Sequence, residues 1–270
     1  MPMPDRAEPP VLMTVAGHVA TLTINRPLVR NAMDSHAHLA LSQALDAIQA
    51  DDGIRVVVLT GAGDQAFSAG RDLKEVAAQP EMDEAGRQAL EARWAQVRRL
   101  TDRHDFFKPV IARVNGLALG GGFELALACD LIVAAEQASF ALPEPRRGLI
   151  ATAGGVHRLP RQLPLKAAMG MLLTGRSMTA GQAWQMGLVN EVVPLAGLDD
   201  AVAAWAQDIL ACAPLSVQAT KQAAMLGLGQ PLAQAQAASY PLEEKRQASL
   251  DSKEGPRAFA AKRTPVWLGR

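Results

Sequence analysis

The sequence predicts an α/β protein with a helical C-terminal part. Three short apolar runs rich in β-branched residues, at 55–60, 109–114 and 131–134, are typical of buried strands. Segments with helical spacing of apolar residues lie between them, and such alternation is the pattern of an α/β domain. After Gly154 and Gly155 the pattern is almost wholly helical, with breaks at prolines and glycines.

The N-terminal elements follow from the same reasoning. Residues 11–14 and 19–24 flank Gly17, and every second residue of the later run is apolar, which predicts a β-hairpin. Apolar residues at i, i+4 and i+7 begin at Leu41 and predict a helix that Asp34 or Ser35 caps. A charged, alanine-rich stretch at 81–103 predicts a further helix that is exposed and mobile.

Composition bounds the classes of function. The 27 basic residues balance 27 acidic ones, so no overall charge favours nucleic acid or an anionic membrane. The first ten residues lack the basic-then-apolar pattern of an export signal, and no uncharged apolar run is long enough to span a membrane. Cys129 and Cys212 lie in apolar helical contexts, which predicts free core thiols without metal-ligand spacing. We therefore expect a cytoplasmic protein with no bound metal.

The most informative stretch of the chain is 115–148, which follows directly on the strand at 109–114. Three glycines, Gly120 to Gly122, lead into an apolar helical pattern that contains Glu124. Glycines before a helix leave unpaired N–H groups at its positive end and let a ligand approach closely. A glycine triplet alone is equally typical of a tight turn, and a first-turn glutamate alone can simply complement the helix dipole.

A second carboxylate follows 20 residues after Glu124, from the difference 144 − 124. Glu144 lies between Pro143 and Pro145, after a short apolar run that is typical of a strand. Two glutamates on rigid segments, in apolar surroundings and next to unpaired amides, indicate acid–base chemistry beside a stabilised oxyanion.

These motifs together resemble a known family. The pattern Asn-Gly-x-Ala-x-Gly-Gly-Gly-x-Glu-Leu-Ala-x-x-Cys-Asp at 115–130, followed by Phe-x-x-Pro-Glu at 140–144, is similar to the crotonase superfamily and within it to the enoyl-CoA hydratases. Further ordered matches at 57–61, 67–74 and 254–263 extend the resemblance over nearly the whole chain.

The resemblance implies a crotonase-like spiral of ββα units followed by a C-terminal α-helical trimerisation region. Residues 1–197 would form the core that binds coenzyme A and carries out the reaction, and residues 198–270 would form the helical oligomerisation region. A homotrimer or a dimer of trimers is then expected. Coenzyme A would belong to the substrate, an acyl-CoA thioester, and no cofactor is implied.

The resemblance also implies roles for particular residues. Glu124 would activate water and Glu144 would protonate the α-carbon, while the main-chain amides of Arg71 and Gly121 would bind the thioester oxygen. The reaction would be hydration of a 2-enoyl-CoA thioester or its reverse. The remaining residues implied in substrate and coenzyme binding are Arg26, Ala66, Phe67, Ala69, Asp72, Leu73 and Gly120, with Phe259 and Lys262 contributed by a neighbouring subunit.

The sequence departs from the family pattern at three places: the size and charge of the Arg71 side chain, and two further segments that bear on specificity. Arg146-Arg147 replaces an apolar pair, and Ala151-Thr152 stands where Pro-Gly is usual, both at positions expected near the acyl tail. The C-terminal Pro-x-Trp-x-Gly-Arg also resembles carnitinyl-CoA dehydratases, so a branched or functionalised acyl group is the alternative.

Three other functions are less favoured by the sequence. An enoyl-CoA isomerase or a catalytically silent scaffold is disfavoured because both glutamates are present. An RNA-binding relative would need a basic helix, and the arginines at 87–103 are diluted by acidic residues. None of the five histidines, including His36 and His38, has a catalytic partner in the sequence, so we expect structural roles for them.

Overall fold

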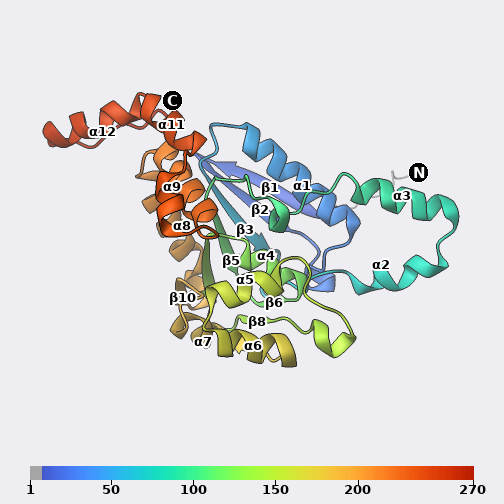
Figure 1. Ribbon diagram of the computed structural model, residues 1–270. Helices are drawn as coiled ribbons and strands as arrows, with labels where there is room; N and C mark the ends of the chain where they lie inside the picture. The colour runs from blue at the N-terminus through green and yellow to red at the C-terminus, as the bar shows by residue number, and fades with distance from the viewer. Residues whose placement is uncertain (1–7) are drawn as a thin grey trace.

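A computed structural model describes residues 8–270 and shows a twisted six-stranded sheet surrounded by helices (Figure 1). The strand order is β1-β2-β3-β5-β7-β10. The β1–β2 pair is antiparallel, as the predicted hairpin requires, and the other neighbours are parallel. The strands are β1 (Val11–Ala16), β2 (Val19–Ile24), β3 (Val56–Gly61), β5 (Val110–Val114), β7 (Leu131–Ala135) and β10 (Glu191–Val193).

A second, smaller sheet lies beside the first, with the order β4-β6-β8-β9. After each of β3, β5 and β7 the chain adds one short strand to this sheet and then enters helical segments, so the chain forms a spiral of ββα turns. The predicted crotonase-like spiral is therefore confirmed. The four strands are β4 (Ala66–Ser68), β6 (Leu117–Leu119), β8 (Ser139–Ala141) and β9 (Met178–Thr179).

Helices cover both faces of the large sheet, with α1 and α4 on one side and α8 on the other (Figure 1). Asp34 caps α1, since its side chain accepts a hydrogen bond from the Ala37 N–H. The helices are α1 (Ser35–Ala50), α2 (Leu73–Ala78), α3 (Glu84–Trp94), α4 (Gly121–Leu127), α5 (Gly155–Gln162), α6 (Leu165–Thr174), α7 (Ala180–Gln185), α8 (Leu198–Leu210), α9 (Pro214–Gly227), α10 (Leu232–Ala237), α11 (Pro241–Ala248) and α12 (Asp251–Ala260).

The buried strands alternate their side chains between two apolar clusters. Val57 and Leu59 of β3 point into the cluster that contains α1 and α4, whereas Val56 and Val58 point into the cluster closed by α8. Because both faces are covered, all six residues of β3 are buried and the strand is continuously apolar up to Leu59.

Helix α8 corrects one expectation about the C-terminal region. We expected the apolar stripes from Leu198 onwards to be buried by a partner, but Leu198 and Val202 pack on the sheet of the same chain. Trp205 and Ile209 lie against the same cluster, whereas Cys212, predicted to be a core thiol, is exposed. The division of the chain at residue 198 stays a prediction, and α8 is structurally part of the core.

One further expectation was wrong in detail. The stretch 81–103 is not one helix, because α3 ends at Trp94 and the chain then turns inward, where the Arg103 side chain is fully buried. The region after Gly155 is almost wholly helical, as predicted, and the exceptions are β9 and β10, which each add a short strand to a sheet. Both strands are too short for a periodic signal.

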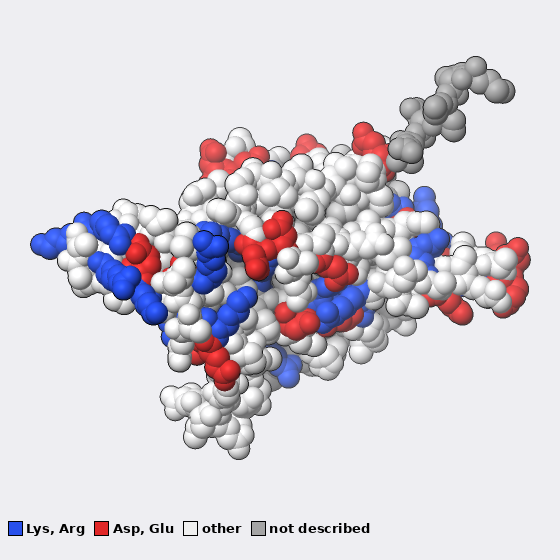
Figure 2. Space-filling model, turned by 90° about the horizontal axis from the view of Figure 1, so that it is seen from above, with Lys and Arg blue, Asp and Glu red and all other residues white. Residues whose placement is uncertain are grey.

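The C-terminal helices α11 and α12 form an arm that extends away from the sheets (Figure 1). Lys and Arg side chains gather along this arm in the view from above (Figure 2). No helix within residues 8–270 is long and apolar enough to cross a bilayer. Residues 1–7, which bear on the export-signal expectation, lie outside the described part of the chain.

Candidate active site

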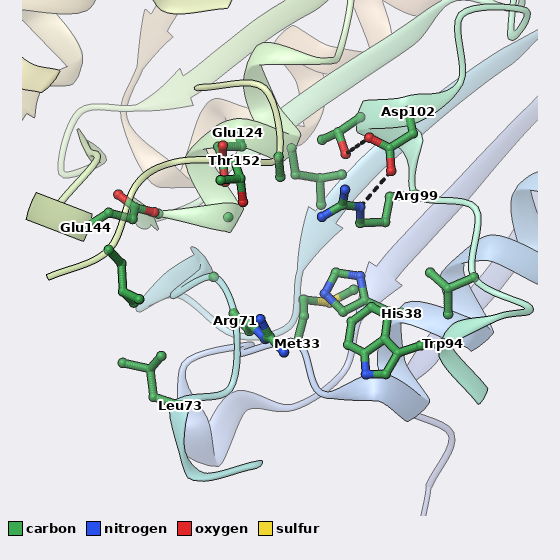
Figure 3. A pocket seen from close by; sticks show the side chains of 18 of the residues that line it. Met33, His38, Arg71, Leu73, Trp94, Arg99, Asp102, Glu124, Glu144 and Thr152 are labelled. Carbon is green, nitrogen blue, oxygen red and sulfur yellow. Dashed lines mark hydrogen bonds and ion pairs between the residues drawn. The ribbon is translucent and has the colours of Figure 1, made fainter. Parts of the chain in front are cut away.

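A cavity of about 1230 Å³ opens between α1, α3, the loop after β4, the start of α4 and the segment after β8. It is lined on one side by Gly120, Gly121, Glu124 and Glu144, which we call the glutamate wall. His38, Arg71, Trp94 and Arg99 line the other side and form what we call the arginine wall (Figure 3). The cavity thus brings together carboxyl groups and guanidinium groups from segments that lie far apart in the sequence.

Glu124 is placed by the turn between β6 and α4. Gly120 has φ 52°, a left-handed conformation that suits glycine, and it lets α4 begin abruptly at Gly121. Glu124 lies in the first turn of α4 and is only 4% exposed. Its Oε1 accepts a hydrogen bond of 2.8 Å from the Gly155 N–H at the start of α5.

Burial raises the pKa of Glu124, the Gly155 hydrogen bond partly offsets this, and the nearby Glu144 charge raises the pKa further. Burial also raises the pKa of Glu144, which lies at the start of a 3₁₀ turn after β8. The Oε2 atom of Glu144 is buried and has no hydrogen-bond partner among residues 8–270. The surroundings of Glu144 therefore favour the protonated form, while Glu124 keeps one donor that stabilises its ionised form.

Two main-chain amides, of Arg71 and Gly121, lie close together in the cavity lining beside the glutamates. The Met33 N–H donates to the Gly70 carbonyl at 2.7 Å, and the Met33 carbonyl accepts from the Asp72 amide at 2.9 Å. These two hydrogen bonds flank Arg71, and the Arg71 amide takes part in neither of them. The Gly121 amide is the first of helix α4 and has no helical partner. Within the described chain, no acceptor pairs with the amide of Arg71 or of Gly121.

The absence of a side chain at Gly70 brings these two amides together. A Cβ added at Gly70 would lie 2.6 Å from the Leu119 carbonyl oxygen and 2.8 Å from the Gly121 nitrogen. Only glycine permits this approach, and Gly70 also has φ 85°. The close packing of the two loops leaves a pair of free N–H donors beside the glutamates, which can bind a negatively charged oxygen.

The loop that carries Arg71 is fixed by a neighbouring ion-pair network. Arg26 contacts Asp34 at 2.8 Å and Asp72 at 3.0 Å, and Asp72 caps α2 by accepting from the Lys74 amide. Arg26 and Asp72, which the family resemblance implied in binding, do not line the cavity. Their observed contacts hold the loops together.

The other residues implied in coenzyme binding fall into three groups. Ala69 and Leu73 line the cavity, as Gly120 does. Ala66 and Phe67 do not, because they are 1% and 0% exposed within the core. Phe259 on α12 is 87% exposed and, like Lys262, lies away from the cavity of its own chain.

The arginine wall was not identified from the sequence. Trp94 lies near both His38, with ring centroids 5.1 Å apart, and Arg71, whose guanidinium carbon is 5.7 Å from the indole centroid. His38, for which we expected only a structural role, therefore faces the cavity. These residues come from α1, α3 and two loops, so no local spacing connects them; a lone tryptophan in a polar helix was the one available signal.

Of the residues that depart from the family pattern, Arg71, Arg147 and Thr152 line the cavity. Arg146 instead donates to the Thr174 carbonyl at 2.7 Å, and Ala151 is buried. The arginines between 87 and 103 do not form one basic face, because most of them pair with acidic side chains, as Arg103 does with Asp46. Within residues 8–270, no cluster of three or more His, Cys, Asp and Glu side chains has metal-binding geometry.

Repeated turns that give one strand to each of two sheets are the crotonase architecture, and this chain belongs to the crotonase superfamily. Within the superfamily, the Enoyl-CoA hydratase/isomerase family matches residues 14–270.

Named relatives agree with this family over almost the full chain. The (E)-benzylidenesuccinyl-CoA hydratase of Thauera aromatica is 40% identical over 260 residues, covering 96% of this chain and 99% of the relative. The carnitinyl-CoA dehydratase of Salmonella enteritidis PT4 is 41% identical over 264 residues, with coverages of 96% and 98%. The crystal structure of an enoyl-CoA hydratase from Mycobacterium tuberculosis H37Rv superposes with a TM-score of 0.86 at 39% identity, covering 97% of this chain and 100% of that chain.

Proposed function

We propose that this protein hydrates the 2,3 double bond of a 2-enoyl-CoA thioester, or catalyses the reverse dehydration. The observation that carries the proposal is the pairing of Glu124 with Glu144 beside the unpaired amides of Arg71 and Gly121. Isomerisation needs only one group to move a proton, whereas addition of water uses one group for water and one for the α-carbon.

In the proposed reaction the thioester oxygen accepts hydrogen bonds from the two amides. Negative charge develops on this oxygen as the α-carbon gains carbanion character, and loss of one such donor typically costs about 3–4 kcal/mol of transition-state stabilisation. The amides are free and fixed before substrate arrives, so they need no rearrangement during the reaction.

The two glutamates divide the proton transfers. Glu124, whose ionised form the Gly155 amide stabilises, removes a proton from water as the water oxygen bonds to the β-carbon. Glu144 donates its proton to the α-carbon and becomes ionised. Transfer of one proton from Glu124 to Glu144 through water then restores the starting state. Two ionised carboxylates would repel each other, so the two glutamates together retain one proton more readily than they lose both.

A panel of 2-enoyl-CoA thioesters with short, long, branched and aromatic acyl groups tests this function. Hydration removes the conjugated enoyl absorbance, and mass spectrometry would show a gain of one water. We expect at least one member of the panel to be hydrated. Conversion of a 3-enoyl to a 2-enoyl thioester without any gain of water would instead identify an isomerase.

Within this reaction class, the alternative is a functionalised acyl group. Two relatives are named for benzylidenesuccinyl-CoA and carnitinyl-CoA, and neither name denotes a plain fatty acyl chain. The arginine wall also favours this alternative, because a hydrocarbon tail gains nothing from guanidinium groups that lie in its binding cavity.

We also propose that the protein assembles as a trimer or as two stacked trimers. Three apolar side chains, Leu228 at the end of α9, Leu232 at the start of α10 and Phe259 on α12, are each more than 70% exposed in the single chain. Symmetric association is a common way to bury such a surface. We expect light scattering to give three or six times the 28.6 kDa chain mass. A mass of one chain at micromolar concentration would contradict the assembly.

A further inference from the structure

The arginine wall carries more hydrogen-bond donors than the protein uses. The Arg71 guanidinium has neither an ion pair nor a hydrogen bond within residues 8–270. Arg99 uses only its Nε, which donates to Asp102 at 2.7 Å, so its two Nη groups donate to no described residue. A guanidinium offers five N–H donors, so most donors of this pair are available to a ligand.

Arg103 and Arg158 lie outside the cavity lining and are satisfied by the protein, whereas Arg147 lines the cavity near Glu144. Arg103 donates to the carbonyls of Arg98 and Ser42 and pairs with Asp46, and Arg158 donates to the Thr101 carbonyl at 2.7 Å. These contacts fix the loop between α3 and β5. Arg71 and Arg99 make no comparable main-chain contacts, so stabilising the fold does not account for where their guanidinium groups lie.

Figure 3 shows both guanidinium groups pointing into the open part of the cavity, with His38 and Trp94 beside them. Trp94 supports Arg71 through its indole face, which limits the orientations that the guanidinium adopts. Two cations oriented toward one space bind an anion there better than in bulk water, because the cavity excludes part of the solvent.

Charges of both signs surround His38 in this region. His38 faces Arg71 and Arg99 as well as Asp34 and Asp102, and its pKa is lowered to about 4 by burial first and by the two arginines next. Asp34 is already paired with Arg26, and Asp102 neutralises only Arg99. Glu91 also lines the cavity but forms no ion pair with either guanidinium in the described chain. Arg71 therefore forms no ion pair in the described chain, and neither does Arg147, which lines the cavity near Glu144.

We propose that the arginine wall is a subsite for a carboxylate carried by the acyl group of the thioester. The inference rests on the proposed function, since it names the class of enoyl-CoA that the same cavity takes. A carboxylate accepts hydrogen bonds from two guanidinium groups in planar, charge-assisted geometry. An acyl group that ends in a quaternary ammonium is disfavoured, because the same charges repel it.

Binding of saturated thioesters tests the subsite without any need for hydration. Saturated acyl-CoA esters lack the double bond and do not react, so calorimetry can measure their affinity at one ionic strength. We would compare ω-carboxyacyl-CoA esters from succinyl to suberyl with the n-acyl-CoA ester of equal chain length. At one chain length or more, the carboxylate form should bind at least about tenfold more tightly, as expected for charge-assisted hydrogen bonds.

The matched variants are Arg99→Gln and Arg98→Gln. Both arginines are partly exposed and pair with an aspartate, but only Arg99 lines the cavity. Arg99→Gln should abolish most of the preference for the carboxylate, and Arg98→Gln should preserve it. The monoamide of the preferred carboxyacyl-CoA tests the same point on the unaltered protein, and it should bind like the n-acyl ester.

Three results would overturn the subsite. They are equal affinity for the two series at every length, equal weakening of both series by Arg99→Gln, and undiminished affinity for the monoamide. The second result would assign the guanidinium to coenzyme A, because the coenzyme portion is common to both series. Hydration of neutral enoyl-CoA esters without any carboxylate preference would leave the proposed function standing and remove only this inference.

Discussion

The two walls of the cavity are built in different ways. The glutamate wall comes from segments that directly follow neighbouring strands of the small sheet, β6 and β8, and its backbone is fixed by close contacts such as those at Gly70. The arginine wall combines α1, α3 and two loops, and α3 has no buried residue. A closely packed wall holds reacting groups in fixed geometry, whereas a surface helix can change its residues at little cost to stability.

This difference separates chemistry from selection of the acyl group. Substitutions in the glutamate wall should lower turnover for every substrate, because they remove groups that act on the part shared by all enoyl thioesters. Substitutions in the arginine wall should change which acyl group is accepted. The variants below test this separation, beginning with the largest expected effect.

Glu124→Gln and Glu144→Gln should each lower kcat by about 10²–10⁴-fold while leaving the affinity for saturated acyl-CoA largely intact. Each change preserves size and removes one proton-transferring group. Steady-state kinetics and calorimetry on the same preparations would measure the two effects. Glu136→Gln, at an exposed position after β7, is the control and should keep normal turnover. Normal turnover in either cavity variant would show that its carboxyl group has no role in catalysis.

Gly121→Pro should lower kcat by about 10²–10³-fold, because proline lacks the N–H that is proposed to bind the thioester oxygen. The position is the first of α4, where proline is well tolerated in helices. Gly121→Ala keeps the N–H, and its Cβ would lie 3.5 Å from the Arg71 nitrogen, an ordinary contact, so its loss should be much smaller. Circular dichroism would verify folding, and equal losses in the two variants would argue against the oxyanion role.

The titration of His38 should report on the arginine wall with a smaller effect. In the free protein His38 should titrate at pH about 4, below its ordinary pKa of 6.5, because burial and two guanidinium groups disfavour its charged form. A bound acyl carboxylate would offset the guanidinium charges, so the His38 pKa should rise. Its neutral n-acyl counterpart should cause less change. NMR of the histidine ring carbons measures both, and titration near 6.5 in the free protein would contradict the geometry.

The same lowered pKa has a consequence for folding with a definite sign. The unfolded chain binds a proton at His38 below pH 6.5, whereas the folded chain does so only near pH 4. The contribution of neutral His38 to the free energy of unfolding is therefore complete above pH 6.5 and is lost as the pH falls toward 4.

The parts of the fold that the sequence predicted are those with strong local patterns. The strands β3, β5 and β7 are mostly apolar, with Arg113 as the charged exception in β5, and the start of α1 carries the capping aspartate Asp34. Strand β10 escaped prediction because three residues have too little periodicity to distinguish them from a helix end. The role of α8 was misread because an amphipathic stripe does not specify what covers it.

The site shows the same limit. Glu124 and Glu144 were found because glycines and prolines mark the turns that place them, so the signal was contained in short stretches. Arg99, His38 and Trp94 meet only through the tertiary fold, and each has an ordinary surface role when considered alone. A site that is formed by side chains from distant elements therefore has to be identified from the three-dimensional structure.

The position of α8 has a consequence for how the chain folds as it is synthesised. Strands β3, β5 and β7 leave the ribosome early, but the helix that covers Val56, Val58 and Val133 ends only at Leu210. Until then one apolar face of the nascent sheet has no cover from its own chain, and such a surface invites aggregation or binding by chaperones. Premature termination shortly before Leu198 should consequently produce an insoluble fragment.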